Sequence, residues 1–170
     1  MPRDLINRLI HGALAGMNGA ATMTVLRMLA HRAGIVDQMV PQKAEQWLRR
    51  ITDTDAVASV PALHRVLDHA LHFGYGGAWG ALYSALFGSR RRSHVRPALG
   101  FGLAQWAFGM TMLFPALGIG RSALRSRPRE NVVNIASHLL YSAITAFLTE
   151  EFSRQRRFDV TKKLRQRDVG

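Results

Sequence analysis

The chain has 170 residues, a length that suits one domain, and its formal net charge is +12. It contains no cysteine, which excludes disulfide bonds, thiolate metal sites and cysteine nucleophiles. The charges are segregated, because four windows lack Asp, Glu, Lys and Arg altogether: residues 9–26, 69–89, 97–120 and 131–149.

These four windows predict the class of the protein. A helix needs about 20 mostly apolar residues to cross a bilayer core, and each window is close to that length. A soluble helical bundle would instead show polar stripes with a helical period. We therefore expect an all-α integral membrane protein, a single domain over residues 1–170 with four transmembrane helices in a compact bundle.

The first window has the flanks of a signal peptide but is too long for one. Arg3 and Arg8 precede its apolar run. No small-x-small cleavage site closes that run before Arg27. We therefore expect a retained anchor, followed by a loop over residues 27–68.

Within that loop, the stretch VPQKAEQWLRRI predicts a short amphipathic helix over residues 41–51. Pro41 stands at a natural first helical position. Three of the apolar side chains that share one face are Ala44, Trp47 and Leu48, and cations occupy another face. Such a helix is expected to lie along the membrane surface.

The next helix is expected to start at Pro61 and to run without a breaker to about Phe87, so that its first part protrudes from the membrane. In the third window, Pro115 removes a backbone donor and predicts a kink or an end. The fourth window leads into a basic tail over residues 150–170, which we expect to be helical near the membrane and frayed at its end.

The distribution of cations predicts the orientation. Of the 23 Lys and Arg residues, 13 lie in the N-terminal tail, the turn after the second window and the C-terminal tail. Because cytoplasmic loops are enriched in Lys and Arg, we expect both termini in the cytoplasm. The cations expected to bind anionic lipid headgroups are Arg90, Arg91, Arg92, Arg156, Arg157, Lys162 and Lys163. Nucleic acid is not an expected partner, because the cations flank the windows and do not form one face.

Several short motifs follow one another along the chain: MVPQK at 39–43, HFGYGGAWGALY at 72–83, FPALG at 114–118 and HLLYSAITAFLTEEF at 138–152. Together with the Gly- and Ala-rich first window, their order resembles the YagU-like family of small bacterial inner-membrane proteins of uncharacterised function. The resemblance implies a four-span helical membrane protein and supplies no catalytic residues.

Two histidines, His72 and His138, stand near the starts of the second and fourth windows. Because these windows run in the same direction, we expect both rings at similar depth and turned inward, with Tyr75 and Tyr141 one turn deeper. A lipid-facing ring would leave its N–H unsatisfied. The expected role is a structural hydrogen bond, and the alternative is axial ligation of a b-type haem.

A second histidine pattern consists of His64, Asp68 and His72, which share a helix face at i, i+4 and i+8. With a further ligand such as His138, these side chains would suit a divalent metal. An Asp–His hydrogen bond at the helix entrance is the simpler interpretation.

Small residues four apart let helix backbones approach each other closely. Four such pairs predict a compact bundle and leave room for a dimer: Gly12/Gly16, Gly76/Gly80, Gly100/Ala104 and Ser142/Ala146.

No window contains Asp or Glu, which proton-coupled transporters usually need, and the sequence has no phosphate-binding Gly loop or nucleophile with a nearby base. We therefore expect a non-enzymatic protein, either an accessory or scaffold subunit of a larger membrane complex or a small homo-oligomer. The alternative is a small transporter or channel with a polar path made by Asn18, Gln105, His72 and His138. Convergence of Asn18 and Gln105 with the histidines on a cavity would favour that alternative.

Overall fold

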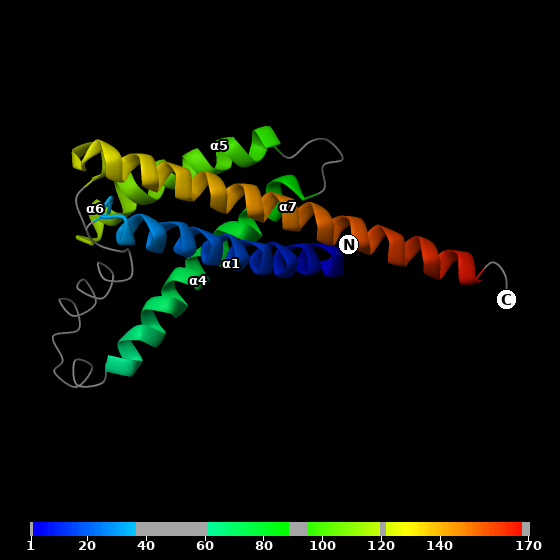
Figure 1. The fold of residues 1–170 in the computed structure, drawn as a ribbon. Coiled ribbons are helices and arrows are strands. Elements are labelled where there is room, and N and C mark those ends of the chain that lie inside the picture. Colours follow the sequence, from blue (N-terminus) through cyan, green and yellow to red (C-terminus); the bar gives the residue numbers. More distant parts are fainter. Residues whose placement is uncertain (1, 37–60, 89–94, 120–121, 168–170) are drawn as a thin grey trace.

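The computed structural model describes residues 2–36, 61–88, 95–119 and 122–167, which form an all-α fold. Four helical segments run up and down alongside one another (Figure 1). They are α1 (Pro2–Arg32), α4 (Pro61–Phe87), α5 (Val95–Trp106) and α7 (Pro128–Arg167). The start of α1 and the C-terminal part of α7 lie toward the same end of the bundle, and α7 projects beyond the other helices there (Figure 1).

The helix α4 has the predicted bounds, and its N-terminal part leaves the bundle at an angle (Figure 1). The helix α1 is longer than its charge-free window, because charged residues at its two ends continue the helical turns. It ends in a Schellman motif. Gly34 adopts a left-handed φ of 69°, and the N–H of Ile35 donates to the Ala30 carbonyl oxygen at 2.9 Å.

The segment that contains Pro115 continues α5 in an unusual form. A π-helix (Ala107–Leu113) follows α5 directly, and the short α6 (Phe114–Ala116) follows it. Proline has no N–H, and in an α-helix its ring would clash with the carbonyl group four residues earlier. The wider π turns before Pro115 accommodate the ring, so the chain stays helical through it. The helix ends at Ala116, and Gly118, two residues further on, adopts a φ of 68°.

The helix α1 packs against both α4 and α7, whereas α5 packs mainly on α7. The contact between α1 and α4 is a glycine seam, formed by Gly12, Gly16, Gly76 and Gly80. A Cβ atom on Gly80 would lie 2.6 Å from the Cα of Gly16 and would also overlap the carbonyl oxygen of Gly12. The two backbones therefore touch, which only glycine permits at these positions.

The other two small-residue pairs behave differently. Ser142 packs against Gly102 of α5, and Ala146 joins a buried cluster with Tyr83, Ala98 and Phe101. The prediction for Gly100/Ala104 is wrong: both residues are exposed, and a Cβ on Gly100 would meet nothing within 4 Å. The residue of α5 that faces α7 closely is Gly102, two positions further along the helix.

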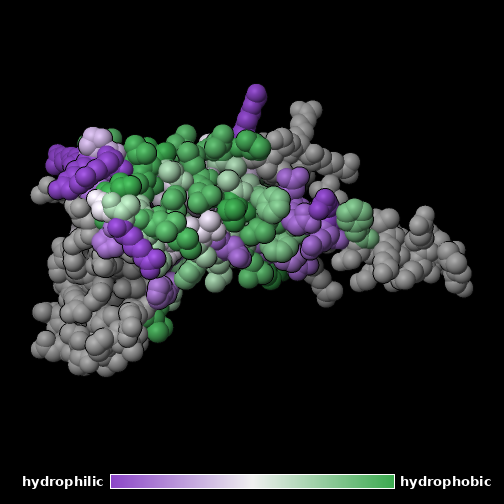
Figure 2. All heavy atoms as spheres, viewed as in Figure 1, coloured by the Kyte–Doolittle hydropathy of each residue, from purple (hydrophilic) through white to green (hydrophobic). Residues whose placement is uncertain are grey.

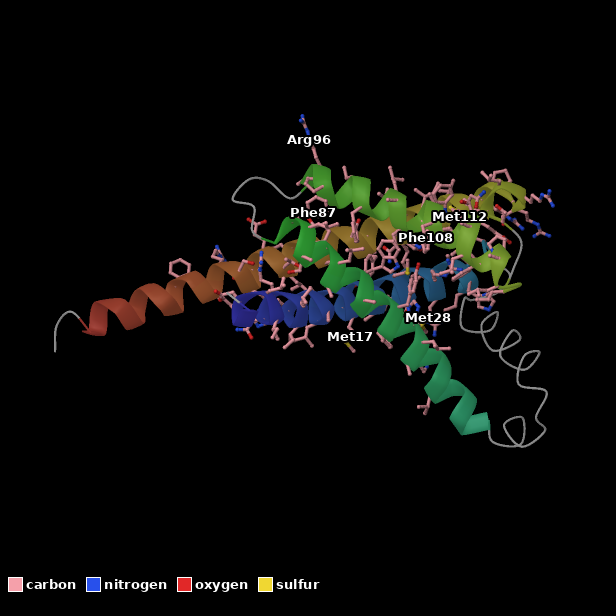
Figure 3. All side chains as sticks on the ribbon, turned by 180° about the vertical axis from the view of Figure 1, so that it is seen from behind. Met17, Met28, Phe87, Arg96, Phe108 and Met112 are labelled. Atoms are coloured by element: carbon pink, nitrogen blue, oxygen red, sulfur yellow. The ribbon has the colours of Figure 1, made fainter. Side chains whose placement is uncertain are left out.

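Much of the outer surface is apolar. On the face shown in Figure 2, an apolar belt covers the middle of the bundle and polar side chains gather at its two ends. Figure 3 labels four apolar side chains that are exposed on the outside: Met17, Met28, Phe108 and Met112. Arg96, at the start of α5, extends away from the bundle (Figure 3).

Two of the described helices are long and apolar enough to cross a membrane, Asp4–Arg32 and Pro128–Gln155. The core helix of a soluble protein can pass the same test of length and composition, but such a helix is mostly buried. Here only 33% and 39% of the two apolar windows are buried inside the protein. Most of this apolar surface therefore faces outward.

Some predictions lie outside the described residues. These are the amphipathic helix over residues 41–51 and the cations Arg90, Arg91 and Arg92. The backbone of α7 includes the basic tail as far as Arg167, but the side chains of Arg156, Arg157, Lys162 and Lys163 are also outside the description.

Candidate functional site

All four helical segments meet around a pocket with a volume of about 40 Å³. This volume would hold about three water molecules. The lining residues are Ala20, Met23 and Arg27 from α1, His72, Tyr75 and Gly76 from α4, Gln105, Met110 and Phe114 from α5 and its continuation, and His138 and Tyr141 from α7. Both predicted histidines and Gln105 therefore meet at one site.

A buried cation stands at this pocket. Arg27 is only 5% exposed, and its Nη1 donates to the side-chain oxygen of Asn134. The carboxylate of Glu130 also interacts with it electrostatically. The prediction that residue 27 begins a loop is wrong, because α1 continues to Arg32 and carries Arg27 into the bundle.

The partners of Arg27 come from one face of α7. Glu130, Asn134 and His138 are spaced four residues apart, so their side chains lie one above the other. The carbonyl oxygen of Asn134 also accepts a hydrogen bond from Nδ1 of His138 at 2.7 Å. Asn134 thus connects the two residues: its side chain binds Arg27, and its backbone carbonyl binds His138.

The hydrogen bonds determine which ring nitrogen of each histidine carries a proton. A carbonyl oxygen can only accept, so Nδ1 of His138 donates, and Nε2 is the acceptor of a neutral ring. Nε2 of His72 lies 3.0 Å from Oγ1 of Thr24, whose own proton is donated to the Ala20 carbonyl oxygen. Nε2 of His72 therefore donates to Thr24, and Nδ1 is its acceptor. Both rings face the bundle interior, as the sequence predicts.

The two tyrosines differ in their partners. The hydroxyl of Tyr141 is buried and donates to the carbonyl oxygen of Gly76 at 2.5 Å. This bond connects α7 to the glycine seam. The hydroxyl of Tyr75 is also buried, beside the indole ring of Trp79, and it donates its own proton to no group among the described residues.

Three polar atoms of the pocket residues are buried without a partner in the described part of the chain: Nε of Arg27, Oε1 of Gln105 and the hydroxyl oxygen of Tyr75. Gln105 is only 2% exposed. A buried polar group without a partner costs about 1–3 kcal/mol. Such groups are normally satisfied by water or by a ligand. All three atoms belong to residues that line the pocket, although the atoms themselves are covered by protein, so the pocket is the candidate binding site among the described residues.

Haem does not fit this site. The pocket holds only a few water-sized molecules, far less than a haem needs. The charge of Arg27 would also repel a metal cation. No group of three or more His, Asp or Glu side chains comes together among the described residues. The predicted metal site cannot be compared further, because the side chains of His64 and Asp68 lie outside the description.

Asn18 does not belong to the pocket. It is exposed, and its side chain donates to the carbonyl oxygen of Leu14 one turn earlier in α1, at 2.8 Å. The predicted polar path therefore contains Gln105 and both histidines but not Asn18.

Sequence reasoning missed Arg27 and Asn134. A usable signal was present, because Glu130, Asn134 and His138 recur at helical spacing inside a mostly apolar helix. Of the motifs noted in the sequence, HFGYGGAWGALY lies on α4 and HLLYSAITAFLTEEF on α7, and both contribute to the pocket. The chain matches no family model, no curated protein and no solved structure.

Proposed function

We propose that the protein is an integral membrane protein of the bacterial inner membrane. Its four spanning segments would be α1, α4, α5 with its continuation to Ala116, and α7. The outward-facing apolar surface of α1 and α7 and the apolar belt in Figure 2 support this proposal. Lipid would cover that surface, and water and headgroups would meet the polar ends.

We further propose that its function is to bind a small polar solute in the pocket, as a small transporter or channel would. One observation carries this proposal. Three buried polar atoms have no hydrogen-bond partner among the described residues, and all three belong to residues that line the pocket, one of them the buried Arg27. Ionisable side chains inside a membrane are costly and usually mark a functional site. The groups that line the pocket bind and orient, and no chemical step is proposed for them.

The glycine residues bear on the choice between a solute-binding protein and a scaffold. The predicted scaffold or homo-oligomer relied on glycine faces that were free to pack against other chains. Gly12, Gly16, Gly76 and Gly80 are instead used within one chain. Among the predicted small-residue pairs, Gly100/Ala104 is the one that stays exposed. The glycines therefore support self-association less than predicted, which favours the alternative function.

The chain offers a clean test because it contains no cysteine. Met110 lines the pocket, whereas Met112, two residues away, is 63% exposed. In membrane vesicles, a charged thiol reagent is expected to label Met110→Cys and to leave Met112→Cys unlabelled, because lipid would cover the second thiol. Faster labelling of Met112→Cys would show that this surface faces water, and would refute the membrane proposal. Absence of labelling at both positions would show that the pocket does not open to molecules larger than a few waters, and would refute a solute path through it.

The orientation has its own test. We propose that both termini are cytoplasmic, and the shared end of the α1 start and the C-terminal part of α7 supports a common side (Figure 1). A reporter that works only in the cytoplasm is expected to be active when fused after Gly170. Activity of an export-dependent reporter at the same place would reverse the orientation.

The projecting part of α7 favours a second candidate function, that of an accessory subunit. This helix extends from Pro128 to Arg167, about 60 Å at 1.5 Å per residue, and its end stands clear of the other helices (Figure 1). Such an arm could contact a larger complex. Deletion of residues 156–170 should then reduce the size of the complex purified in mild detergent. An unchanged size would remove this candidate.

A further inference from the structure

We propose that the pocket binds a small oxyanion of the carboxylate class, with Arg27 as the residue that determines the sign of its charge. This inference rests on the proposed function and names the ligand class of the same pocket. The side chains that carry it are Arg27, Tyr75 and Gln105, each of which has an unpartnered buried atom.

The first step concerns the free edge of the guanidinium group. Nη1 of Arg27 is occupied by the side-chain oxygen of Asn134. The Nε–H and one Nη2–H point in the same direction, on an edge separate from Nη1, and this Nε has no partner in the described part of the chain. Two parallel N–H groups form the fork that binds both oxygen atoms of a carboxylate. The half of Arg27 that Asn134 leaves free therefore has the geometry for an oxyanion, which reaches this edge once the side chains that cover Nε move aside.

The second step concerns the neutral groups of the pocket. The Tyr75 hydroxyl is an unused donor within the same lining. The amide of Gln105 presents an unpartnered oxygen, and a half-turn of that amide would present its NH₂ group instead. The tyrosine and the glutamine can thus add donors to those of Arg27.

The third step concerns charge and size. The N–H groups of His72 and His138 that lie against neighbouring oxygen atoms are committed there and are not available to a ligand. Glu130 interacts with Arg27 but does not line the pocket, which leaves the arginine as the charged group of the lining. A volume of about 40 Å³ suits a carboxylate group or an anion of similar size. The ligand would be either a free small anion or the carboxylate end of a longer molecule.

The test measures the thermal unfolding midpoint of the full chain in mild detergent while sodium formate replaces sodium chloride at constant ionic strength. The wild-type midpoint should rise by about 5 °C at a formate concentration one hundred times the dissociation constant. Arg27→Gln should abolish this rise. Arg32→Gln, which removes an exposed cation from the same helix, should retain it.

Tyr75→Phe keeps the test decisive if Arg27→Gln does not fold. Its hydroxyl has no partner, so the variant should fold as well as the wild type, but its apparent affinity for formate should fall about tenfold. Butyrate in place of formate distinguishes the two sources of the ligand. An equal effect of butyrate indicates the end group of a longer molecule, and a smaller effect indicates a free anion.

A wild-type midpoint that does not respond to formate would overturn the inference, and so would an equal response in all variants, which would be a general salt effect. Labelling of Met110→Cys distinguishes a pocket that does not bind formate from a pocket that solutes cannot enter. If the thiol is labelled and formate has no effect, the pocket is hydrated but does not select anions.

Discussion

The glycine seam and the polar pocket both lie along α1, but the seam is tightly packed and the pocket contains free space. At the seam, the backbones of α1 and α4 touch and leave no space for a single Cβ atom. The pocket begins at Ala20, about one turn beyond Gly16 on α1, and reaches Arg27; here space remains, and three buried polar atoms lack partners in the described chain. The difference follows from the crossing of the two helices, because α4 passes diagonally over α1 and diverges from it toward its own N-terminal end (Figure 1).

This contrast indicates which residues stabilise the fold and which are available to bind a ligand. Close backbone contact gives many small dispersion interactions and no freedom to rearrange. The pocket instead keeps polar groups in positions that cost stability and that a ligand or water can satisfy. We therefore expect substitutions at the seam to affect folding strongly, and substitutions at the unpartnered atoms to affect binding with little effect on folding.

The largest loss of stability is expected for Gly80→Ala. The new methyl group would overlap the backbone of Gly12 and Gly16, which cannot rotate away, so the free energy of unfolding should fall by about 3 kcal/mol. Denaturation in mild detergent measures this loss. Gly74→Ala, in the same helix but with nothing within 4 Å of its Cβ position, should leave stability unchanged or slightly raised. Equal losses in the two variants would contradict the backbone contact.

A smaller loss is expected at the edge of the pocket, for Asn134→Leu. This change removes the side-chain acceptor for Nη1 of Arg27 and leaves a buried charge with less compensation. Hydrogen bonds to charged groups contribute about 1.5–3 kcal/mol, so the free energy of unfolding should fall by about 2 kcal/mol. The same substitution at Asn18 is the control. That side chain is exposed and bonds only within its own turn, so the change should stay within about 0.5 kcal/mol.

Tyr141→Phe should cost about 1 kcal/mol. The variant loses one buried hydrogen bond, from the tyrosine hydroxyl to the carbonyl oxygen of Gly76, and keeps the ring that fills the space. The same denaturation experiment measures the difference from the wild type. A change near zero would mean that this bond between α7 and the glycine seam contributes nothing to the fold.

The smallest effect, and one of opposite sign, is expected for Tyr75→Phe. Because the hydroxyl of Tyr75 is buried without a partner in the described part of the chain, its removal should raise the free energy of unfolding by up to about 1 kcal/mol in ligand-free protein. Tyr141→Phe is the matched comparison, since it deletes the same atom from a satisfied position. If Tyr75→Phe is as costly as Tyr141→Phe, the hydroxyl of Tyr75 is already satisfied.

The fold was largely predictable because long charge-free windows and prolines mark helices strongly. Pro61 and the following turns predict the bounds of α4. The ends of α1 were less predictable, because a charged residue can end a membrane span without ending a helix. Arg27 is the clearest case. Because it is charged, the sequence predicts that it begins a loop, but its hydrogen bond to Asn134 on α7 holds it inside the bundle.

The site was predictable in part. The shared depth of His72 and His138 followed from the direction of their helices, and both line the pocket. Their hydrogen-bond partners, Thr24 and the Asn134 carbonyl oxygen, depend on side-chain directions that spacing alone does not determine. Asn18 shows the same limit, because a polar residue within an apolar window can form its hydrogen bond to a backbone carbonyl of its own helix.

The π-helix between Ala107 and Leu113 affects which residues of this segment face the pocket. The hydrogen bonds of this segment span five residues instead of the four of an α-helix, so each turn holds about one residue more. Gln105, just before the segment, and Met110, within it, both line the pocket. Deleting one residue from the segment would let it close as an α-helix while Phe114 keeps facing the pocket. This wall of the site should therefore tolerate a one-residue deletion that an ordinary α-helix of the bundle would not.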